Sequence, residues 1–262
     1  MENPKISLII PAYNEAVCLS ACLDSVAAQT VAPDEVIVID NNSTDTTALV
    51  AKNYAFVRVV KEKQQGIVHA RNAGFQAASG DVLARVDADV VLPRTWVADV
   101  RAFYQNSDNA NVCMTGGGQP DNLPCPRILG WLQSQIAFRF NRLLIGHYIL
   151  FGSNMAIPRV AWRVVEAETC RRTDIHEDLD LSIHVHRAGY KITYRAGLLV
   201  TGRAARVTSQ RNELLGNLLL WPATLRVHSL KTWIFGWVGA YALYVLSFPL
   251  WGLAKLVKNK MK

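Results

Sequence analysis

The chain has 262 residues, of which 50% are apolar and 19% are charged. This balance excludes a disordered chain, and the ordinary glycine and proline content excludes a collagen-like one. The length suits one large α/β domain with a buried core and an appendage, and it excludes a peptide-sized binding module.

The net charge of +7 lies at the C-terminal end of the chain. Up to Val200 there are 19 basic and 20 acidic residues, whereas from Thr201 onward there are nine basic residues and one acidic residue. A nucleic-acid-binding domain carries its basic stripe on the folded part, so we expect no nucleic-acid partner. A basic C-terminal segment favours anionic membrane lipid.

Five cysteines without a C-x-x-C pair fit core packing in a reducing compartment. Residues 1–15 lack the long apolar stretch and the cleavage site of a signal peptide. We therefore expect the main domain in the cytoplasm.

Short β-branched runs alternate with helical patterns over the first ninety residues, which is typical of a parallel sheet with crossover helices. The expected strands are Ile6–Tyr13, Asp34–Asn41, Val57–Glu62 and Asp81–Asp89. The expected helices are Glu15–Gln29, Ser43–Tyr54 and Gly66–Ser79. Ligands of such Rossmann-like sheets bind beyond the carboxyl ends of the strands, where polar residues of this sequence gather.

Longer helices and isolated strands follow Asp89 and predict a mixed second half that completes the site. The expected helices are Leu92–Asn106, Arg127–Leu144 and His176–Ala188. The expected extended segments are Val112–Gly116, Leu150–Ile157 and Lys191–Val200. His184 and His186 lie two apart on the last helix, so they point to different faces and are interpreted as packing or surface residues.

A run of 23 uncharged residues, Thr232–Ala254, predicts a membrane-associated or transmembrane helix, because about 20 apolar residues span a bilayer. Its tryptophans and tyrosines include candidate interfacial anchors. A buried core helix is the alternative. We expect a basic amphipathic connector at residues 206–231 before this helix and a basic tail at residues 255–262 after it.

Asp87-Ala88-Asp89 closes the fourth expected strand. Residues two apart in a regular strand point to the same face, so both carboxylates are expected to meet one ligand. One carboxylate can hold Mg²⁺ or Mn²⁺ while the other holds a ribose or sugar hydroxyl. Solvated loop acids are the alternative interpretation.

Five segments together are similar to motifs of the family-2 glycosyltransferases with the GT-A fold. They are Ser7–Glu15, Ile37–Asp45, Gly66–Gly74, Asp87–Asp89 and Glu177-Asp178. The resemblance covers roughly the first 190 residues. It implies an α/β GT-A domain over residues 1–205, with a Rossmann-like mixed sheet flanked by helices and followed by the C-terminal membrane-associated helix.

The resemblance implies a nucleotide pocket at the end of the first strand, lined by Pro11, Ala12, Tyr13 and Glu15. Tyr13 offers an aromatic face to a base, and ordinary packing is its alternative. Asp40 matches the acid that reads the base edge, although an Asp at this position also suits a cap for a helix near Ser43.

The resemblance also implies contacts to the diphosphate and the sugar, made by Arg71, Asn72, Asp87 and Ala88, with Asp89 as the metal ligand. Arginine suits phosphate through its planar fork of donors, and an exposed helix arginine is the alternative. Ser153 and Asn154 resemble an acceptor-side strand, and a plain turn is their alternative.

Glu177-Asp178 resembles the catalytic acid pair of the family, which places the base at the second acid, Asp178. In an inverting transfer such a carboxylate takes the proton of the acceptor hydroxyl. The alternative is that both acids only favour a helix N-terminus.

We therefore expect a metal-dependent inverting glycosyltransferase with Mg²⁺ or Mn²⁺ as cofactor. Its expected donor is a nucleotide sugar, favoured as UDP-linked, and its expected acceptor is a glycan or a lipid-linked molecule at the cytosolic membrane face. A Q-x-x-R-W motif is absent after Asp178, which disfavours a processive synthase. The alternatives are a polyprenyl-phosphate glycosyltransferase, a sugar nucleotidyltransferase and an inactive membrane scaffold.

Overall fold

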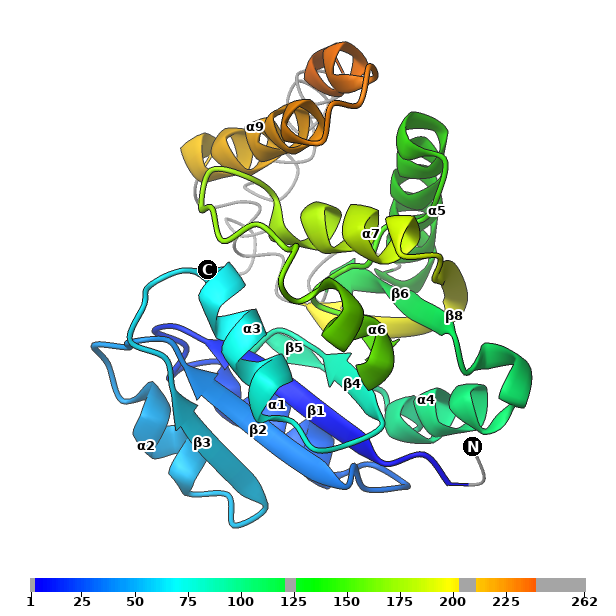
Figure 1. The fold of residues 1–262 in the computed structure, drawn as a ribbon. Coiled ribbons are helices and arrows are strands. Elements are labelled where there is room, and N and C mark those ends of the chain that lie inside the picture. Colours follow the sequence, from blue (N-terminus) through cyan, green and yellow to red (C-terminus); the bar gives the residue numbers. More distant parts are fainter. Residues whose placement is uncertain (1–2, 121–125, 203–210, 239–262) are drawn as a thin grey trace.

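A single eight-stranded sheet with helices on both faces forms the body of the protein (Figure 1). The computed structural model describes residues 3–120, 126–202 and 211–238. The strand order is β3-β2-β1-β4-β7-β6-β8-β5, so the N-terminal strands occupy one half of the sheet and the later strands the other. The predicted α/β class with a mixed sheet is confirmed.

The N-terminal half is parallel, as predicted. Its strands are β1 (Ile6–Ala12), β2 (Glu35–Asp40), β3 (Val57–Lys61) and β4 (Val82–Arg85). The crossover helices are α1 (Leu19–Ala27), α2 (Thr47–Lys52) and α3 (Ile67–Ala77).

The fourth strand ends earlier than predicted. It stops at Arg85, and Asp87-Ala88-Asp89 lie in the loop and turn that follow it. The argument that Asp87 and Asp89 share one face of a strand is therefore wrong. A two-residue strand, β5 (Val90–Val91), follows the turn and was not predicted.

The second half of the sheet is mixed. β7 (Met155–Pro158) runs antiparallel to β4, and β6 (Val112–Pro120) pairs antiparallel with β7 and parallel with β8 (Lys191–Gly202). The remaining elements are α4 (Trp96–Gln105), η1 (Ser107–Asn109), α5 (Pro126–Ile145), α6 (Arg159–Val165) and α7 (Glu177–Arg187). The extended segment predicted from Leu150 begins only at Met155, because residues 152–154 form a turn and a bend.

The expected connector at residues 206–231 is mostly helical where it is described. It contains α9 (Arg211–Val227), which packs beside α7, and Thr224 Oγ1 accepts a hydrogen bond of 2.8 Å from the backbone N–H of His176. Residues 233–238 are helical, and the rest of the predicted membrane helix and the basic tail lie outside the described residues. Across 3–120, 126–202 and 211–238, no helix has the length and hydropathy needed to cross a bilayer.

Alternation along β1 divides the core between the two faces of the sheet. Ile6, Leu8 and Ile10 belong to a cluster with side chains of α1 and α4. Ile9 belongs to a second cluster with α3, α6 and α7. The helix that carries Glu177 and Asp178 is therefore anchored against the sheet face opposite α1.

The side chain of Asn154 connects three elements in the interior. It is fully buried, its Nδ2 donates to the carbonyls of Gly117 at 2.9 Å and Leu198 at 2.8 Å, and its Oδ1 accepts from Trp96 Nε1 at 2.9 Å. All of these bonds hold β6, β8 and α4 together. The amide is thus engaged by the protein itself, and the acceptor-side role expected for Asn154 stays a prediction.

Replacing Asn154 by alanine removes a hydrogen-bond partner from three buried polar groups, Trp96 Nε1 and the carbonyls of Gly117 and Leu198. Each such group costs about 1–3 kcal/mol, so we expect Asn154→Ala to lower the free energy of unfolding by at least about 3 kcal/mol. Urea denaturation followed by circular dichroism measures this change. The exposed Asn53 serves as the control, since Asn53→Ala is expected to stay within about 0.5 kcal/mol of wild type. Equal effects of the two variants would contradict the structural role.

Candidate active site

The polar residues predicted to meet at the carboxyl edge of the sheet do follow adjacent strands. Ala12 pairs with Asp40 across β1 and β2, and Ile9 pairs with Arg85 across β1 and β4. The ends of these three parallel strands therefore lie side by side, which is where ligands of α/β sheets bind. Tyr13 is 47% exposed there, so its ring is accessible to a ligand.

Arg85, at the end of β4, contacts carboxylates from both halves of the fold. Its guanidinium is buried, with Nη1 donating to Asp178 Oδ1 at 3.0 Å and Nη2 donating to Asp87 Oδ1 at 3.2 Å. Both nitrogens also lie 3.3 Å from Glu177 Oε1. The turn after β4 and the start of α7 are thereby joined across about ninety residues of sequence.

The carboxylates around Arg85 extend from the surface into the interior. The side chain of Asp87 is 32% exposed, that of Glu177 13% and that of Asp178 9%. Asp87 is thus the most accessible of the three carboxylates, and Asp178 is the least accessible.

Asp178 is held on both oxygens. Its Oδ1 accepts from Arg85, and its Oδ2 accepts from the backbone N–H of Gly152 at 2.8 Å. Burial, followed by the negative charge of Glu177, raises the pKa of Asp178 to about 6. A carboxyl group with this pKa is mostly ionised at neutral pH and is more basic than an ordinary aspartate.

Glu177 responds differently to the same surroundings. Burial opposes its ionisation, but the positive charges of Arg85, His176 and Arg71 outweigh burial and lower the pKa of Glu177. Both acids lie in the first turn of α7, so the favourable helix N-terminus that we considered as an alternative is also present. The two neighbouring acids are thus electrostatically unequal.

Ser153 and Asp87 are direct neighbours. The hydroxyl of Ser153 donates a short hydrogen bond to Asp87 Oδ2, while Asp87 Oδ1 accepts from Arg85. Residues 152 and 153 form a turn, which was the alternative to an acceptor-side strand. This turn brings Gly152 against Asp178 and Ser153 against Asp87.

Arg71 lies behind the carboxylates and is fully buried, so the alternative of an exposed helix arginine is wrong. Its Nη1 donates to the backbone carbonyl of Glu177 at 2.7 Å, and its Nε and Nη2 donate to Asn72 Oδ1 at 3.1 and 3.0 Å. In this structure Arg71 therefore supports the start of α7, and the expected contact of Arg71 and Asn72 with a diphosphate stays a prediction.

The polar side chains at the end of β2 are held by hydrogen bonds to the backbone of nearby loops. Asp40 is buried, and its Oδ1 accepts from the N–H of Ser43 at 3.2 Å. The helix considered for an Asp40 cap begins at Thr47 instead of near Ser43, so Asp40 closes a turn before that helix. Asn41, to which the sequence analysis assigned no role of its own, donates to two loop carbonyls, those of Glu62 and Gln64.

Asp89 fits a hard divalent cation by its chemistry. It is half-buried in the turn after β4, and its negative charge, together with that of Asp87, adds to burial in raising the pKa of Cys22. Two carboxylates therefore concentrate negative charge at one place, and oxygen ligands of this kind are those that Mg²⁺ and Mn²⁺ prefer.

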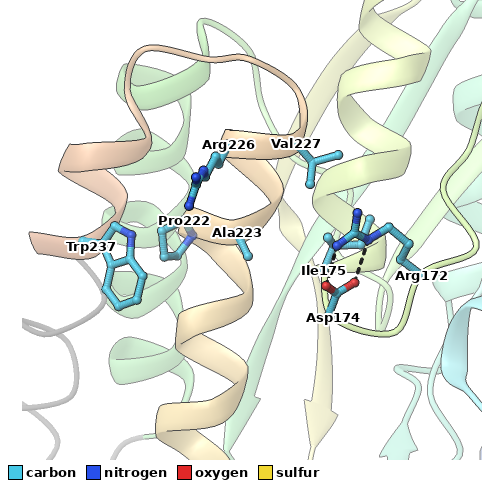
Figure 2. Close-up of a pocket in the computed structure, with 8 residues that line it drawn as sticks. All are labelled: Arg172, Asp174, Ile175, Pro222, Ala223, Arg226, Val227 and Trp237. Carbon is cyan, nitrogen blue, oxygen red and sulfur yellow. Dashed lines mark hydrogen bonds and ion pairs between the residues drawn. The ribbon is translucent and has the colours of Figure 1, made fainter.

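A cavity of about 430 Å³ lies between α9 and the loop that precedes α7 (Figure 2). We call it the connector pocket. It is lined by Arg172, Asp174, Ile175, Pro222, Ala223, Arg226, Val227 and Trp237. Arg172 and Asp174 form an ion pair of 2.6 Å within it. Because Ile175 is two residues before Glu177, this pocket adjoins the element that carries the acid pair.

A Rossmann-like parallel half joined to antiparallel strands, with acids at the carboxyl edge, defines an α/β domain of the GT-A type. The chain belongs to glycosyl transferase family 2, whose family model matches residues 7–163. That match covers more than half of the chain and includes Asp87 and Asp89.

Curated relatives match a smaller segment. The chain is 37% identical over 101 residues to glycosyltransferase AglE of Haloferax volcanii, which is 36% of this chain and 33% of that protein. It is 39% identical over 135 residues to glycosyltransferase YibD of Escherichia coli, which is 47% of this chain and 39% of that protein. The matches thus span about a third of these relatives' length.

Solved structures share the fold over nearly the whole chain. A mannosyltransferase of Pyrobaculum calidifontis, in complex with GDP-Man and Mn²⁺, has a TM-score of 0.68 at 18% identity, covering 99% of this chain and 76% of that one. Glucosyl-3-phosphoglycerate synthase of Mycobacterium tuberculosis has a TM-score of 0.62 at 17% identity, covering 85% and 79%.

Gly152 has no space for a side chain. A Cβ atom there would lie 2.7 Å from Arg85 Cζ, Arg85 Nη2 and Asp178 Oδ1. We expect Gly152→Ala to displace the carboxylate cluster and to lower glycosyl transfer at least about 100-fold, since small misplacements near reacting groups carry such costs. Gly197→Ala is the matched control, because nothing lies within 4 Å of a Cβ at that position. Wild-type activity in Gly152→Ala would contradict this geometry.

Removal of Arg85 leaves three carboxylates without their common partner. We expect Arg85→Met to lower the free energy of unfolding by about 3–5 kcal/mol, as for other broken buried ion pairs. The loss should shrink as the pH falls, because protonation of the acids removes their repulsion. Urea titrations at several pH values measure both effects. Arg58→Met, which breaks a partly exposed pair with Glu35, is the control and should cost less than about 1 kcal/mol.

Proposed function

We propose that this protein transfers a sugar, with inversion, from a nucleotide-sugar donor to an acceptor hydroxyl. The observation that carries the proposal is the position of Arg85, which brings Asp87 at the sheet edge together with the buried acid pair of α7. A donor at the sheet edge and a proton acceptor at the helix start are then separated by one side chain.

The nucleotide part of the donor would occupy the ends of β1 and β2. Pro11 and Ala12 form the buried end of β1, Tyr13 offers its exposed ring to a base, and the carboxyl group of Asp40 lies at the paired end of β2. We favour uridine because an acid at Asp40 accepts from its ring N–H. A structure of Staphylococcus aureus TarS with the same fold contains UDP-GlcNAc, at 18% identity and a TM-score of 0.58.

Asp89 is the proposed ligand of Mg²⁺ or Mn²⁺. When bound, the cation offsets the negative charge that develops on the departing diphosphate. Asp87, hydrogen-bonded by Ser153 and Arg85, is oriented to contact the donor sugar from the same turn. Ala88, between these two acids in the sequence, packs in the core cluster with α1 and α4, so its proposed contact with the donor is through its backbone.

Asp178 is the proposed base. It accepts the proton of the acceptor hydroxyl, whose oxygen forms a bond to the anomeric carbon while the bond to the nucleoside diphosphate breaks on the opposite face. Its raised pKa of about 6 supports this role, because the carboxylate is both ionised and sufficiently basic near neutral pH. Glu177, ionised beside Arg85, keeps the guanidinium in position.

We propose that the acceptor is lipid-linked and approaches from the cytosolic membrane face through the connector pocket. The pocket combines Arg226 and the ion pair of Arg172 and Asp174 with apolar side chains, those of Ile175, Val227 and Trp237. Such a lining suits a molecule with an anionic headgroup and an apolar part. A polyprenyl phosphate as the acceptor itself is the second candidate, favoured by the positive charge of Arg226 in this pocket.

A panel of nucleotide sugars tests this function with purified protein, Mg²⁺ or Mn²⁺ and membrane lipid extract. We expect Asp178→Asn to lower kcat by about 10²–10⁴-fold with little change in the donor KM. Asp89→Ala is expected to abolish stimulation by the divalent cation. The exposed Asp108 provides the matched control, Asp108→Asn, which should retain full activity.

The proposed base also predicts how the activity in the same assay depends on pH. Because protonation of Asp178 removes the base, kcat/KM should fall as the pH falls through about 6. Full turnover by Asp178→Asn would contradict a base and favour the polyprenyl phosphate, whose oxygen is already ionised. Absence of turnover with every nucleotide sugar would contradict the proposed function.

A further inference from the structure

Four potential metal ligands meet on the side of α7 that faces α9. They are Cys170, Asp180, His184 and His228, and each offers one ligand atom within 4.8 Å of all the others. Two belong to α7, one to the loop before it and one to the chain just after α9. Asp180 is two residues from Asp178, and residues two apart on a helix do not face each other. The cluster is therefore separate from the carboxylates around Arg85.

Asp180 is the centre of this cluster. It is fully buried, its Oδ1 lies 2.8 Å from His228 Nε2 and 3.4 Å from His184 Nε2, and its Oδ2 accepts from the N–H of Cys170 at 3.0 Å. Asp180 and His184 are four residues apart, so they occupy one face of α7.

His184 is the unexplained member. It is only 9% exposed, and neither of its ring nitrogens makes a hydrogen bond that meets ordinary geometry. Buried polar groups without partners are rare in native proteins and call for a cause such as an ion. Each nitrogen instead faces a carboxylate at ion-pair distance, Nε2 at 3.4 Å from Asp180 and Nδ1 at 3.5 Å from Glu168. The earlier interpretation of His184 as an ordinary packing residue does not account for this polar arrangement.

We propose that Cys170, Asp180, His184 and His228 bind one zinc ion. Zinc takes four ligands in a tetrahedron and accepts sulfur, imidazole nitrogen and carboxylate oxygen, which is the set present here. At bond lengths of about 2.0–2.3 Å the ligand atoms of a tetrahedron lie roughly 3.3–3.8 Å apart. The observed spacing, at most 4.8 Å, needs only small side-chain movements to reach this geometry.

The surroundings of His184 support zinc coordination. Glu168 Oε2 lies 3.5 Å from His184 Nδ1, on the ring edge opposite the nitrogen that faces Asp180. A carboxylate that accepts from the second ring nitrogen is the usual outer partner of a zinc-bound histidine, and it fixes the ring orientation.

His228 must exchange one contact. Arg187 Nη1 lies 3.2 Å from His228 Nδ1, and Arg187 Nη2 donates to the carbonyl of His228 at 2.9 Å. When Nε2 binds zinc, the ring proton moves to Nδ1 and the first of these contacts is lost, whereas the second persists. The thiol proton of Cys170 is released to solvent, so thiolate and carboxylate together balance the ion's charge.

Such a site is structural, because protein atoms fill all four positions and leave none open for a substrate. It would fasten the loop before α7 and the end of α9 to the helix that begins with Glu177. It also differs chemically from Asp89, since thiolate and imidazole select zinc over Mg²⁺ and Mn²⁺.

The test uses untagged, full-length protein that is stripped with a chelator and then titrated with zinc in excess Mg²⁺, which saturates oxygen-only sites. We expect one tightly bound zinc per chain, measured by elemental analysis after gel filtration. Co²⁺ in place of zinc should show the visible bands of tetrahedral coordination and a thiolate charge-transfer band.

Single substitutions distinguish the proposed zinc ligands from nearby residues that do not bind the ion. Cys170→Ser should abolish the charge-transfer band and weaken zinc binding by more than the roughly 10–100-fold loss expected for the outer-partner variant Glu168→Gln. Cys18→Ser and His186→Gln, which change a cysteine outside the cluster and an exposed histidine on the same helix, should still bind one zinc.

Absence of tight zinc uptake by the wild type would overturn the proposal, and so would uptake that Cys170→Ser leaves unchanged. If Cys170→Ser does not fold, the Co²⁺ spectrum of the wild type decides alone, because a spectrum without a thiolate band excludes the site.

Discussion

A buried guanidinium, that of Arg85, is the interaction on which the candidate site depends. Moving an arginine out of water is costly, and it is tolerated here because Asp87, Glu177 and Asp178 surround it. The same contacts keep three acids close together that would otherwise repel one another. Arg85 therefore acts as both the counter-ion and the spacer of the site, and the planar fork of arginine suits this better than the ammonium of lysine.

The second half of the sheet places the partners of Arg85. β7 runs antiparallel to β4 with Met155 opposite Arg85, so the turn at Gly152 and Ser153 comes to lie beside the end of β4. α7 packs on the sheet face that also carries α3 and α6, and Arg71 of α3 holds the carbonyl of Glu177. A parallel half and a mixed half of the sheet thus meet at one cluster of charges.

α7 has two chemically different sides. Its first turn supplies Glu177 and Asp178 to the carboxylates around Arg85, whereas Asp180 and His184 turn toward α9 and the loop that contains Cys170. The proposed zinc ion would therefore stabilise the position of α7 without touching the donor. The connector pocket is formed by the same loop and α9, so zinc binding would also fix the relative position of its walls.

The sequence alone was enough to predict the alternation of strands and helices and to identify the family motifs, because both depend on local patterns of apolar and polar residues. It misplaced Asp87 and Asp89 on a strand, since a chain turn after Arg85 has no glycine or proline signal there. Arg85 and the His184 cluster were missed, although a charged residue inside an apolar strand was a usable signal. Only the tertiary structure showed which residues surround Arg85 and His184. Their partners lie far away in the sequence, and the pairing of charges, unlike the burial of apolar residues, follows no regular spacing along the chain.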